Sequence, residues 1–323
     1  MNSAHEMASM AQLVLDAHER IRSSIVETPL ELIPDLAPGL PLRVLFKLEN
    51  LQRTGSFKLR GATNKILSLS PKQAEDGVIA ASNGNHGLGV AAAAKAVGVP
   101  AEVYVSSKVP RSKVKRIEEY NARVRVAGKE PLDAELAARE AASKSGKVFI
   151  SPYNDREVIA GQGTIAVEMH HQAPQIDAVF VAVGGGGLIS GIGSYLKSVW
   201  PHTEVVGCWP ENSRVLYESI KAGRILDFPE QPTLSESTAG GLEPESLTLD
   251  IARSVIDRMT LVSEVEILSA MRRIRDLRGW VVEGAAAVAL ASFLKDAPRY
   301  SGKTVAVVIC GGNVSPEVLH QLR

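Results

Sequence analysis

The chain has 323 residues, with 36 Lys and Arg side chains against 36 Asp and Glu, so its formal net charge is zero. A neutral chain lacks the basic surface that nucleic-acid-binding proteins and proteins of anionic membranes need, so we expect neither partner. Two cysteines are too few for a disulfide framework or a cysteine zinc site, and the N-terminus has no apolar leader, which together indicate a cytoplasmic location.

Short apolar runs alternate with longer amphipathic or alanine-rich segments along almost the whole chain. This alternation is typical of α/β proteins, in which crossover helices join parallel strands. Ligands of such sheets bind beyond the carboxyl ends of the strands, so the loops that follow strands are the places to search for a site. The predicted strands are 43–47, 78–81, 101–105, 123–126, 148–150, 178–183, 204–208 and 304–310, and the predicted helices include 87–97, 111–120, 132–145 and 157–170.

The first unusual segment, residues 54–62, reads Thr-Gly-Ser-Phe-Lys-Leu-Arg-Gly-Ala and places Lys58 where a loop meets a predicted helix. A lone lysine is usually a solvated side chain. In a site shielded from water the pKa of a lysine falls, and the neutral amine becomes a nucleophile suited to Schiff-base chemistry. Lys58 is therefore the candidate nucleophile.

The loop at 82–87, after the strand at 78–81, reads Ser-Asn-Gly-Asn-His-Gly. Its backbone N–H groups could bind a carboxylate, while an asparagine side chain contacts a second group. Ser and Asn are also good helix caps, so a purely structural role explains this loop equally well when it is taken alone.

Four glycines at 184–187 follow the strand at 178–183 and precede a predicted helix. The uncharged stretch 178–196 has nineteen residues, long enough for a membrane span, but six of them are glycine, which favours a strand, a loop and a helix start. Neither a G-x-G-x-x-G pattern nor a Walker lysine is present. A tight turn needs only one or two glycines, so we favour an anion-binding loop that suits a phosphate.

The last such loop, Cys310-Gly311-Gly312-Asn313, follows a predicted strand that ends near 309. A buried free cysteine is usually a small apolar residue. Its position at the carboxyl end of a strand, before two glycines, indicates that it could instead face a ligand.

These four motifs, in this order, resemble fold-type II pyridoxal-phosphate (PLP) enzymes and, more narrowly, the threonine dehydratase and serine racemase family. The segment 158–168 adds a further match. The resemblance implies a tryptophan synthase β-like α/β fold with two open parallel-sheet domains. Residues 1–77 plus 151–323 would form the large, PLP-binding domain and 78–150 the small domain, with no C-terminal regulatory domain and with a homodimer as the assembly.

The resemblance also implies a role for each matching residue. Lys58 would link covalently to the cofactor and act as the base on the α-carbon, and Phe57 would pack beside the ring. Asn85 would hydrogen-bond the ring hydroxyl, and Cys310 would lie beside the pyridine nitrogen. The phosphate would be bound by Gly184, Gly185, Gly186, Gly187 and Leu188, and the substrate carboxylate by Ser82, Asn83, Gly84, Asn85 and His86.

A thiol at position 310 has a chemical consequence. A neutral thiol is a weak donor and cannot hold the pyridine nitrogen protonated as a carboxylate would. The ring is then a poorer electron sink, which favours loss of a β-hydroxyl almost in concert with removal of the α-proton. We therefore expect a catabolic PLP-dependent dehydratase (ammonia-lyase) that converts L-threonine or L-serine into a 2-oxo acid and ammonia.

Several alternatives stay open. The substrate could be a larger 3-hydroxy amino acid, such as phenylserine, 3-hydroxyaspartate or a hydroxyectoine-derived compound. A serine racemase would have a second serine as a base in the substrate loop, and Asn83, whose amide is not a practical proton acceptor, stands there instead. A β-replacement enzyme of the cysteine synthase type would share the cofactor. A non-catalytic PLP-binding scaffold protein is disfavoured by the intact Lys58, Asn85 and glycines.

No metal site is expected. The racemase branch often binds a divalent cation through a Glu before a Pro and an Asp a few residues later. Here Trp209 precedes Pro210, and Val215 stands near the position of the Asp; neither offers an oxygen ligand, although Glu211 could be a shifted one.

Five further features could belong to the site or to the packing around it. Glu283 is expected either near the pyridine edge or as a helix N-terminal acid stabilised by the dipole. Ser151, Tyr153 and Trp209 are expected mainly as packing residues, with a role in shaping the pocket as the alternative. The segment 239–244 is expected near the mouth of the site.

Overall fold

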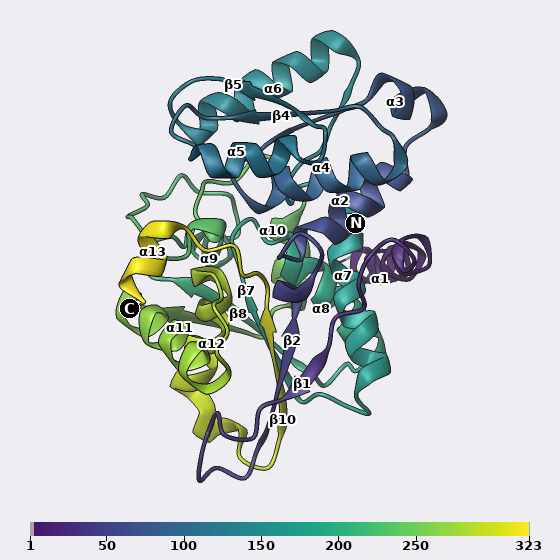
Figure 1. The fold of residues 1–323 in the computed structure, drawn as a ribbon. Helices are drawn as coiled ribbons and strands as arrows, with labels where there is room; N and C mark the ends of the chain where they lie inside the picture. The colour runs from purple at the N-terminus through teal and green to yellow at the C-terminus, as the bar shows by residue number, and fades with distance from the viewer. Residues whose placement is uncertain (1–2, 323) are drawn as a thin grey trace.

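The structure is a computed structural model that describes residues 3–322 (Figure 1). A larger sheet has the strand order β1-β2-β10-β7-β8-β9, and a smaller sheet has the order β5-β4-β3-β6. All pairings are parallel except that of β1 with β2. The strands are β1 (Leu30–Leu32), β2 (Arg43–Leu48), β3 (Val78–Ala81), β4 (Ala101–Val105), β5 (Arg123–Val126), β6 (Val148–Phe149), β7 (Ala178–Ala182), β8 (Glu204–Pro210), β9 (Arg258–Val262) and β10 (Thr304–Ile309).

The helices supply the crossovers between the parallel strands, which confirms the predicted α/β fold. They are α1 (Ser3–Ile21), α2 (Lys58–Leu67), α3 (Pro71–Asp76), α4 (Asn85–Val97), α5 (Arg111–Glu118), α6 (Pro131–Ser145), α7 (Arg156–Gln172), α8 (Gly187–Val199), α9 (Val215–Ala222), α10 (Thr248–Val255), α11 (Glu264–Arg278), α12 (Gly284–Asp296) and α13 (Pro316–Gln321).

The larger sheet is covered on both faces. Figure 1 shows α11 and α12 on one side of it and α1, α7 and α8 on the other. All five residues of β7 are buried, which is why this strand reads as a continuous apolar run rather than an alternating one. Phe180 of β7 makes edge-on aromatic contacts with Phe293 and Tyr300, with ring centroids 5.6 and 5.4 Å apart, and these contacts fill the core beside the sheet.

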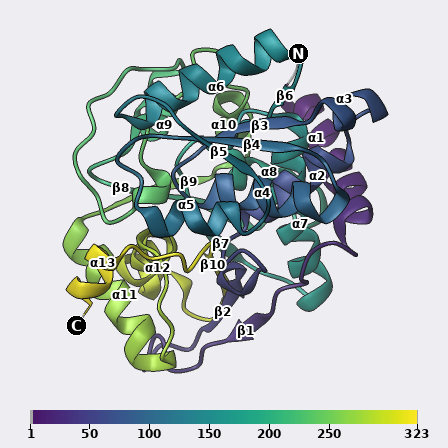
Figure 2. The same cartoon turned by 45° about the horizontal axis from the view of Figure 1, so that its top comes forward.

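The smaller sheet is formed entirely by strands between residues 78 and 149. In Figure 2 it lies between α6 on one side and α4 and α5 on the other. Helix α2 packs against both α4 and α7, and so lies where the two sheets with their helices meet (Figure 1). The exact division into a large and a small domain stays a prediction.

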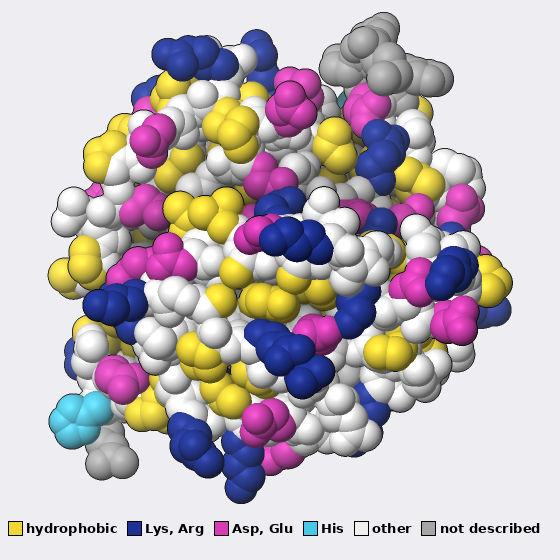
Figure 3. All heavy atoms as spheres, turned by 90° about the horizontal axis from the view of Figure 1, so that it is seen from above, with side chains coloured by type: hydrophobic (Ala, Val, Ile, Leu, Met, Phe, Trp, Pro, Cys, Tyr) yellow, Lys and Arg dark blue, Asp and Glu magenta, His cyan; other side chains and the backbone are white. Residues whose placement is uncertain are grey.

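The surface shows no single dominant charge on the face seen from above. Figure 3 shows Lys and Arg side chains interspersed with Asp, Glu and apolar side chains there, without a continuous basic patch. Across residues 3–322, no helix combines the length and the apolar character that a membrane crossing requires.

Candidate active site

Lys58 and Cys310 are brought together by the backbone. The N–H of Phe57 donates to the carbonyl of Cys310 at 3.0 Å, and the N–H of Gly312 donates to the carbonyl of Gly55 at 2.9 Å. Lys58 begins α2, and Cys310 directly follows β10. The two predicted loops therefore meet at the carboxyl end of a strand of the larger sheet, where an α/β protein is expected to bind a ligand.

The side chain of Lys58 is half-buried, with its amino end turned inward. Its Nζ donates to the carbonyl of Pro152 at 2.7 Å. Burial lowers the pKa of Lys58 to about 8, although the nearby Cys310 and Glu283 oppose the shift. Near neutral pH a larger fraction of this amine is therefore unprotonated than for a solvated lysine, so it can act as a nucleophile or a base.

Two side chains of the Ser-Asn-Gly-Asn-His-Gly loop point into the protein. The Asn83 amide donates to the Ser106 hydroxyl at 2.8 Å and accepts from the Ser106 N–H at 2.9 Å. The His86 Nε2 lies 2.8 Å from the Ile150 carbonyl, which can only accept, so Nε2 carries the proton. Burial, with Lys58 close by, lowers the pKa of His86 to about 3, so its ring is neutral.

The backbone of the same loop faces open space at Gly84. The N–H of Gly84 donates to the Ser82 hydroxyl at 3.0 Å, and a Cβ on Gly84 would meet no atom within 4 Å. Helix α4 begins at Asn85 without a side-chain N-cap. The loop can therefore offer backbone N–H groups and a helix N-terminus to an anion, which is the chemistry that a substrate carboxylate needs.

Asn85, Glu283 and Asn313 meet on the other side of the loop. The Asn85 Nδ2 donates to Glu283 Oε2 at 2.8 Å, and the Asn313 Nδ2 donates to Asn85 Oδ1 at 2.7 Å. The Cys310 Sγ lies 3.9 Å from Glu283 Oε1, and burial raises the pKa of the Cys310 thiol well above its usual value. Cys310 is thus a neutral thiol. Although Glu283 is the N-cap residue of α12, its side chain makes no capping bond and lies beside this thiol.

The glycines at 184–187 are required by their neighbours. A Cβ on Gly185 would lie 2.4 Å from the Tyr153 ring, and one on Gly184 would lie 2.8 Å from the Thr238 carbonyl oxygen. Gly186 has a φ of +84° and precedes α8, which begins without a side-chain cap. The hydroxyl of Ser190, in the first turn of α8, is buried and has no hydrogen-bond partner among residues 3–322. An uncapped helix N-terminus beside a bare backbone is a phosphate-binding arrangement.

One residue of the segment 239–244, which is expected near the mouth of the site, forms contacts that the sequence did not predict. Glu243, in the segment 239–244, accepts from the Ser151 hydroxyl at 3.2 Å and from Asn154 Nδ2 at 2.9 Å. Arg139 on α6 lies 2.8 Å from Glu243 Oε1, and the Tyr153 hydroxyl accepts from the Glu243 N–H. These contacts join α6 to the loop that precedes α10, and no local pattern in the sequence signals them.

Two other predicted positions differ in exposure, because Trp209 is buried and Glu211 is exposed. Trp209 is 1% exposed, and its ring contacts the Tyr217 ring edge-on, so it is a core residue. Glu211 follows β8, and its N–H donates to the Val262 carbonyl. Among residues 3–322, no group of three His, Cys, Asp or Glu side chains is arranged to hold a metal ion.

Residues 21–311 match the family described as pyridoxal-phosphate-dependent enzymes. The chain belongs to this family. It is 38% identical over 309 residues to an L-threonine ammonia-lyase of Thermotoga maritima, covering 96% of this chain and 77% of that protein. The processed form of threonine deaminase isoform 2 from Solanum lycopersicum has a TM-score of 0.92 at 31% identity, covering 97% of this chain and 92% of that one. Maize serine racemase has a TM-score of 0.90 at 30% identity, covering 96% and 95%. The predicted resemblance is thus confirmed.

The residues of this PLP enzyme fit its cofactor. PLP needs an amine for covalent attachment, a site for a phosphate dianion and a group beside its ring nitrogen. Lys58 supplies an amine of lowered pKa, and the glycines at 184–187 leave the N-terminus of α8 free for an anion. The neutral thiol of Cys310 lies in the same site, because its loop pairs with the residues that precede Lys58.

Proposed function

We propose that this PLP enzyme is a dehydratase that converts an L-3-hydroxy amino acid, L-threonine or L-serine, into a 2-oxo acid and ammonia. The observation that carries the proposal is the pairing of an amine of lowered pKa with a neutral thiol in one site. We also propose a cytoplasmic homodimer, with 1–77 plus 151–323 as the large domain and 78–150 as the small one. The confinement of the smaller sheet to residues 78–149 supports this division.

In this proposal each cofactor group has a named partner. Lys58 would hold PLP covalently, Phe57 would pack beside the ring, Asn85 would donate to the ring hydroxyl, and the Cys310 thiol would lie at the ring nitrogen. The phosphate is held by Gly184, Gly185, Gly186, Gly187 and Leu188. When bound, PLP supplies an electron-withdrawing ring that makes the α-hydrogen of the attached amino acid acidic.

The residues of the chain then control one proton and one leaving group. The N–H groups at the start of α4 hold the substrate carboxylate and so orient the α-hydrogen toward Lys58. Lys58, once the amino group of the substrate has displaced it from PLP, would remove that proton with its neutral Nζ. Because the neutral Cys310 thiol would not hold the ring nitrogen protonated, bound PLP would be a weak electron sink, which favours loss of the β-hydroxyl together with the α-proton, as one molecule of water. Water then releases the 2-oxo acid and ammonia.

The pH dependence of PLP binding tests the state of Lys58. Only the neutral amine attacks an aldehyde, so the rate of covalent PLP attachment to the apoprotein should rise as the pH increases through about 8 and level off above it. Stopped-flow absorbance would measure this rate, with N-acetyl-lysine as the control. A midpoint near that of a solvated lysine, about 10.4, would contradict a desolvated Lys58.

The serine racemase alternative makes a different prediction about products. Racemisation needs a second base on the face of the substrate opposite Lys58, and both ends of the Asn83 amide are occupied by Ser106. We expect the enzyme to release ammonia and 2-oxo acid from L-threonine and L-serine with little D-serine. Coupled ammonia assays and chiral chromatography would decide. D-serine formed at a rate that rivals ammonia release would favour the racemase.

A further inference from the structure

Asn313 ends the Cys-Gly-Gly-Asn motif and forms three side-chain contacts. Its Nδ2 donates to the carbonyl of Thr54 at 2.9 Å and to Asn85 Oδ1 at 2.7 Å. Its Oδ1 accepts from Arg116 Nη1 of α5 at 3.0 Å. The Asn313 side chain therefore links the loop before Lys58, the substrate loop and a helix of the smaller sheet.

The partners of Asn313 fix the direction of this chain of hydrogen bonds. A backbone carbonyl can only accept and a guanidinium can only donate, so Thr54 and Arg116 together allow one orientation of the Asn313 amide. In that orientation its second N–H faces Asn85, which must present Oδ1. The Asn85 NH₂ group then points the other way, and one of its N–H bonds goes to Glu283. One donor remains on Asn85.

The backbone leaves room for this arrangement at one glycine. Gly55 has a φ of +76°, and a Cβ there would lie 2.8 Å from Asn313 Oδ1. A side chain at position 55 would therefore displace the Asn313 amide. The orientation at the Asn313 end also holds whatever the protonation state of Glu283, whose pKa burial raises.

We propose that Asn313 is a positioning residue that commits Asn85 to donate, so that Asn85 stabilises the deprotonated form of the cofactor ring hydroxyl. The inference rests on the proposed contact between Asn85 and that hydroxyl. An Asn85 turned the other way would present an acceptor and favour the protonated hydroxyl instead. Asn313 would therefore affect the cofactor spectrum, although it acts on the ring only through Asn85.

The test is the absorbance of PLP-loaded Asn313→Asp as a function of pH. The aspartate keeps the Arg116 contact but cannot donate, and it places an acceptor against Asn85 Oδ1. We expect the long-wavelength band to lose intensity to a band at shorter wavelength. The apparent pKa of the ring hydroxyl, read from this change of absorbance with pH, should rise by about one unit. PLP should bind about tenfold more weakly. Asn313→Ala should shift the band in the same direction but by a smaller amount. This variant replaces Asn313→Asp in the test if the aspartate variant does not fold.

Two comparisons separate the possible outcomes. Asn212→Asp removes an exposed amide-to-carbonyl bond with Pro232, which takes no part in the hydrogen bonds of Asn85 or Asn313, and should leave the spectrum unchanged. Asn85→Ala should shift the band. If Asn85→Ala shifts it while both Asn313 variants keep the wild-type spectrum and PLP affinity, the positioning role is wrong and the Asn85 contact stands. If Asn85→Ala changes nothing, the proposed contact itself fails, and this inference fails with it.

Discussion

Replacing Lys58 with alanine is expected to lower kcat by at least about a thousandfold and to abolish the visible absorption of the loaded protein. The proposed Lys58 amine both attaches the cofactor and removes the α-proton, so its loss removes both functions at once. The fold should survive, because the side chain is half-buried and its hydrogen bond goes only to the Pro152 carbonyl. Steady-state ammonia release and absorbance, with far-UV circular dichroism for the fold, measure the three effects.

The matched control is a lysine of the same helix. Lys65 forms an ion pair with Asp155 at 2.6 Å and is partly exposed, so Lys65→Ala should keep both the colour and the turnover. A Lys58→Ala variant that turns over substrate like the wild type would refute the assignment of Lys58.

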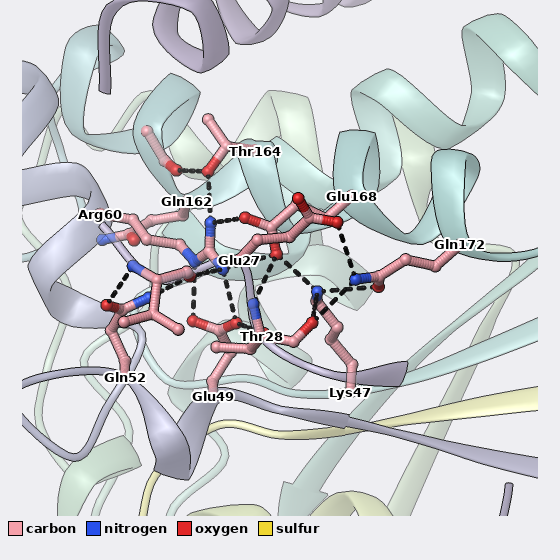
Figure 4. A network of polar contacts seen from close by, with 12 residues as sticks. Glu27, Thr28, Lys47, Glu49, Gln52, Arg60, Gln162, Thr164, Glu168 and Gln172 are labelled. Carbon is pink, nitrogen blue, oxygen red and sulfur yellow. Dashed lines mark hydrogen bonds and ion pairs between the residues drawn. The ribbon is translucent and has the colours of Figure 1, made fainter. Parts of the chain in front are cut away.

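Replacing Arg60 with methionine is expected to destabilise the protein by about 3–5 kcal/mol, which would be the largest stability loss in this set of variants. Figure 4 shows the network of polar contacts around Arg60 that explains this loss of stability. Arg60 is fully buried and its guanidinium binds the carboxylates of Glu49 and Glu168, with N–O distances of 2.6–2.8 Å. Methionine fills a similar volume but leaves two carboxylates with only Lys47 as a buried cation.

The pKa of Glu49 indicates how strongly Arg60 acts. Burial alone would raise the pKa of this fully buried carboxyl, but Arg60, followed by Lys47 and Thr28, more than offsets burial and lowers it. Arg125→Met is the matched control, since Arg125 is 41% exposed in its pair with Glu102 and should change stability by less than about 1 kcal/mol. Urea denaturation of both variants gives the comparison. Equal midpoints would contradict the importance of the buried network.

The alternation of apolar runs was enough to predict the parallel sheets, but not the two edge strands of the larger sheet, β1 and β9. Strand β1, Leu-Glu-Leu, has only three residues and none of them is fully buried, so its apolar pattern is too short to indicate a strand. Strand β9 starts with Arg258 and is half-buried along much of its length, and it too was not predicted. Helix α11 was also missed, although Ser263 and Glu266 form a capping box that is visible in the sequence.

For the candidate site, the motifs indicated loops at the carboxyl ends of strands, but not the directions of their side chains. Asn83 and His86 turn to Ser106 and Ile150, partners that the chain brings close only through strand pairing. Asn313 could be seen as part of a motif, but its contact with Asn85 depends on two loops more than 200 residues apart in sequence. Local patterns cannot report such contacts, because they arise from tertiary packing.

The central claim is that Lys58 carries the cofactor. Borohydride reduction of the PLP-loaded protein would fix the cofactor on its lysine, and peptide mass spectrometry would then locate it. The account predicts a single pyridoxyl adduct, on the peptide that contains Lys58. An adduct on another lysine, with Lys58 unmodified, would contradict it.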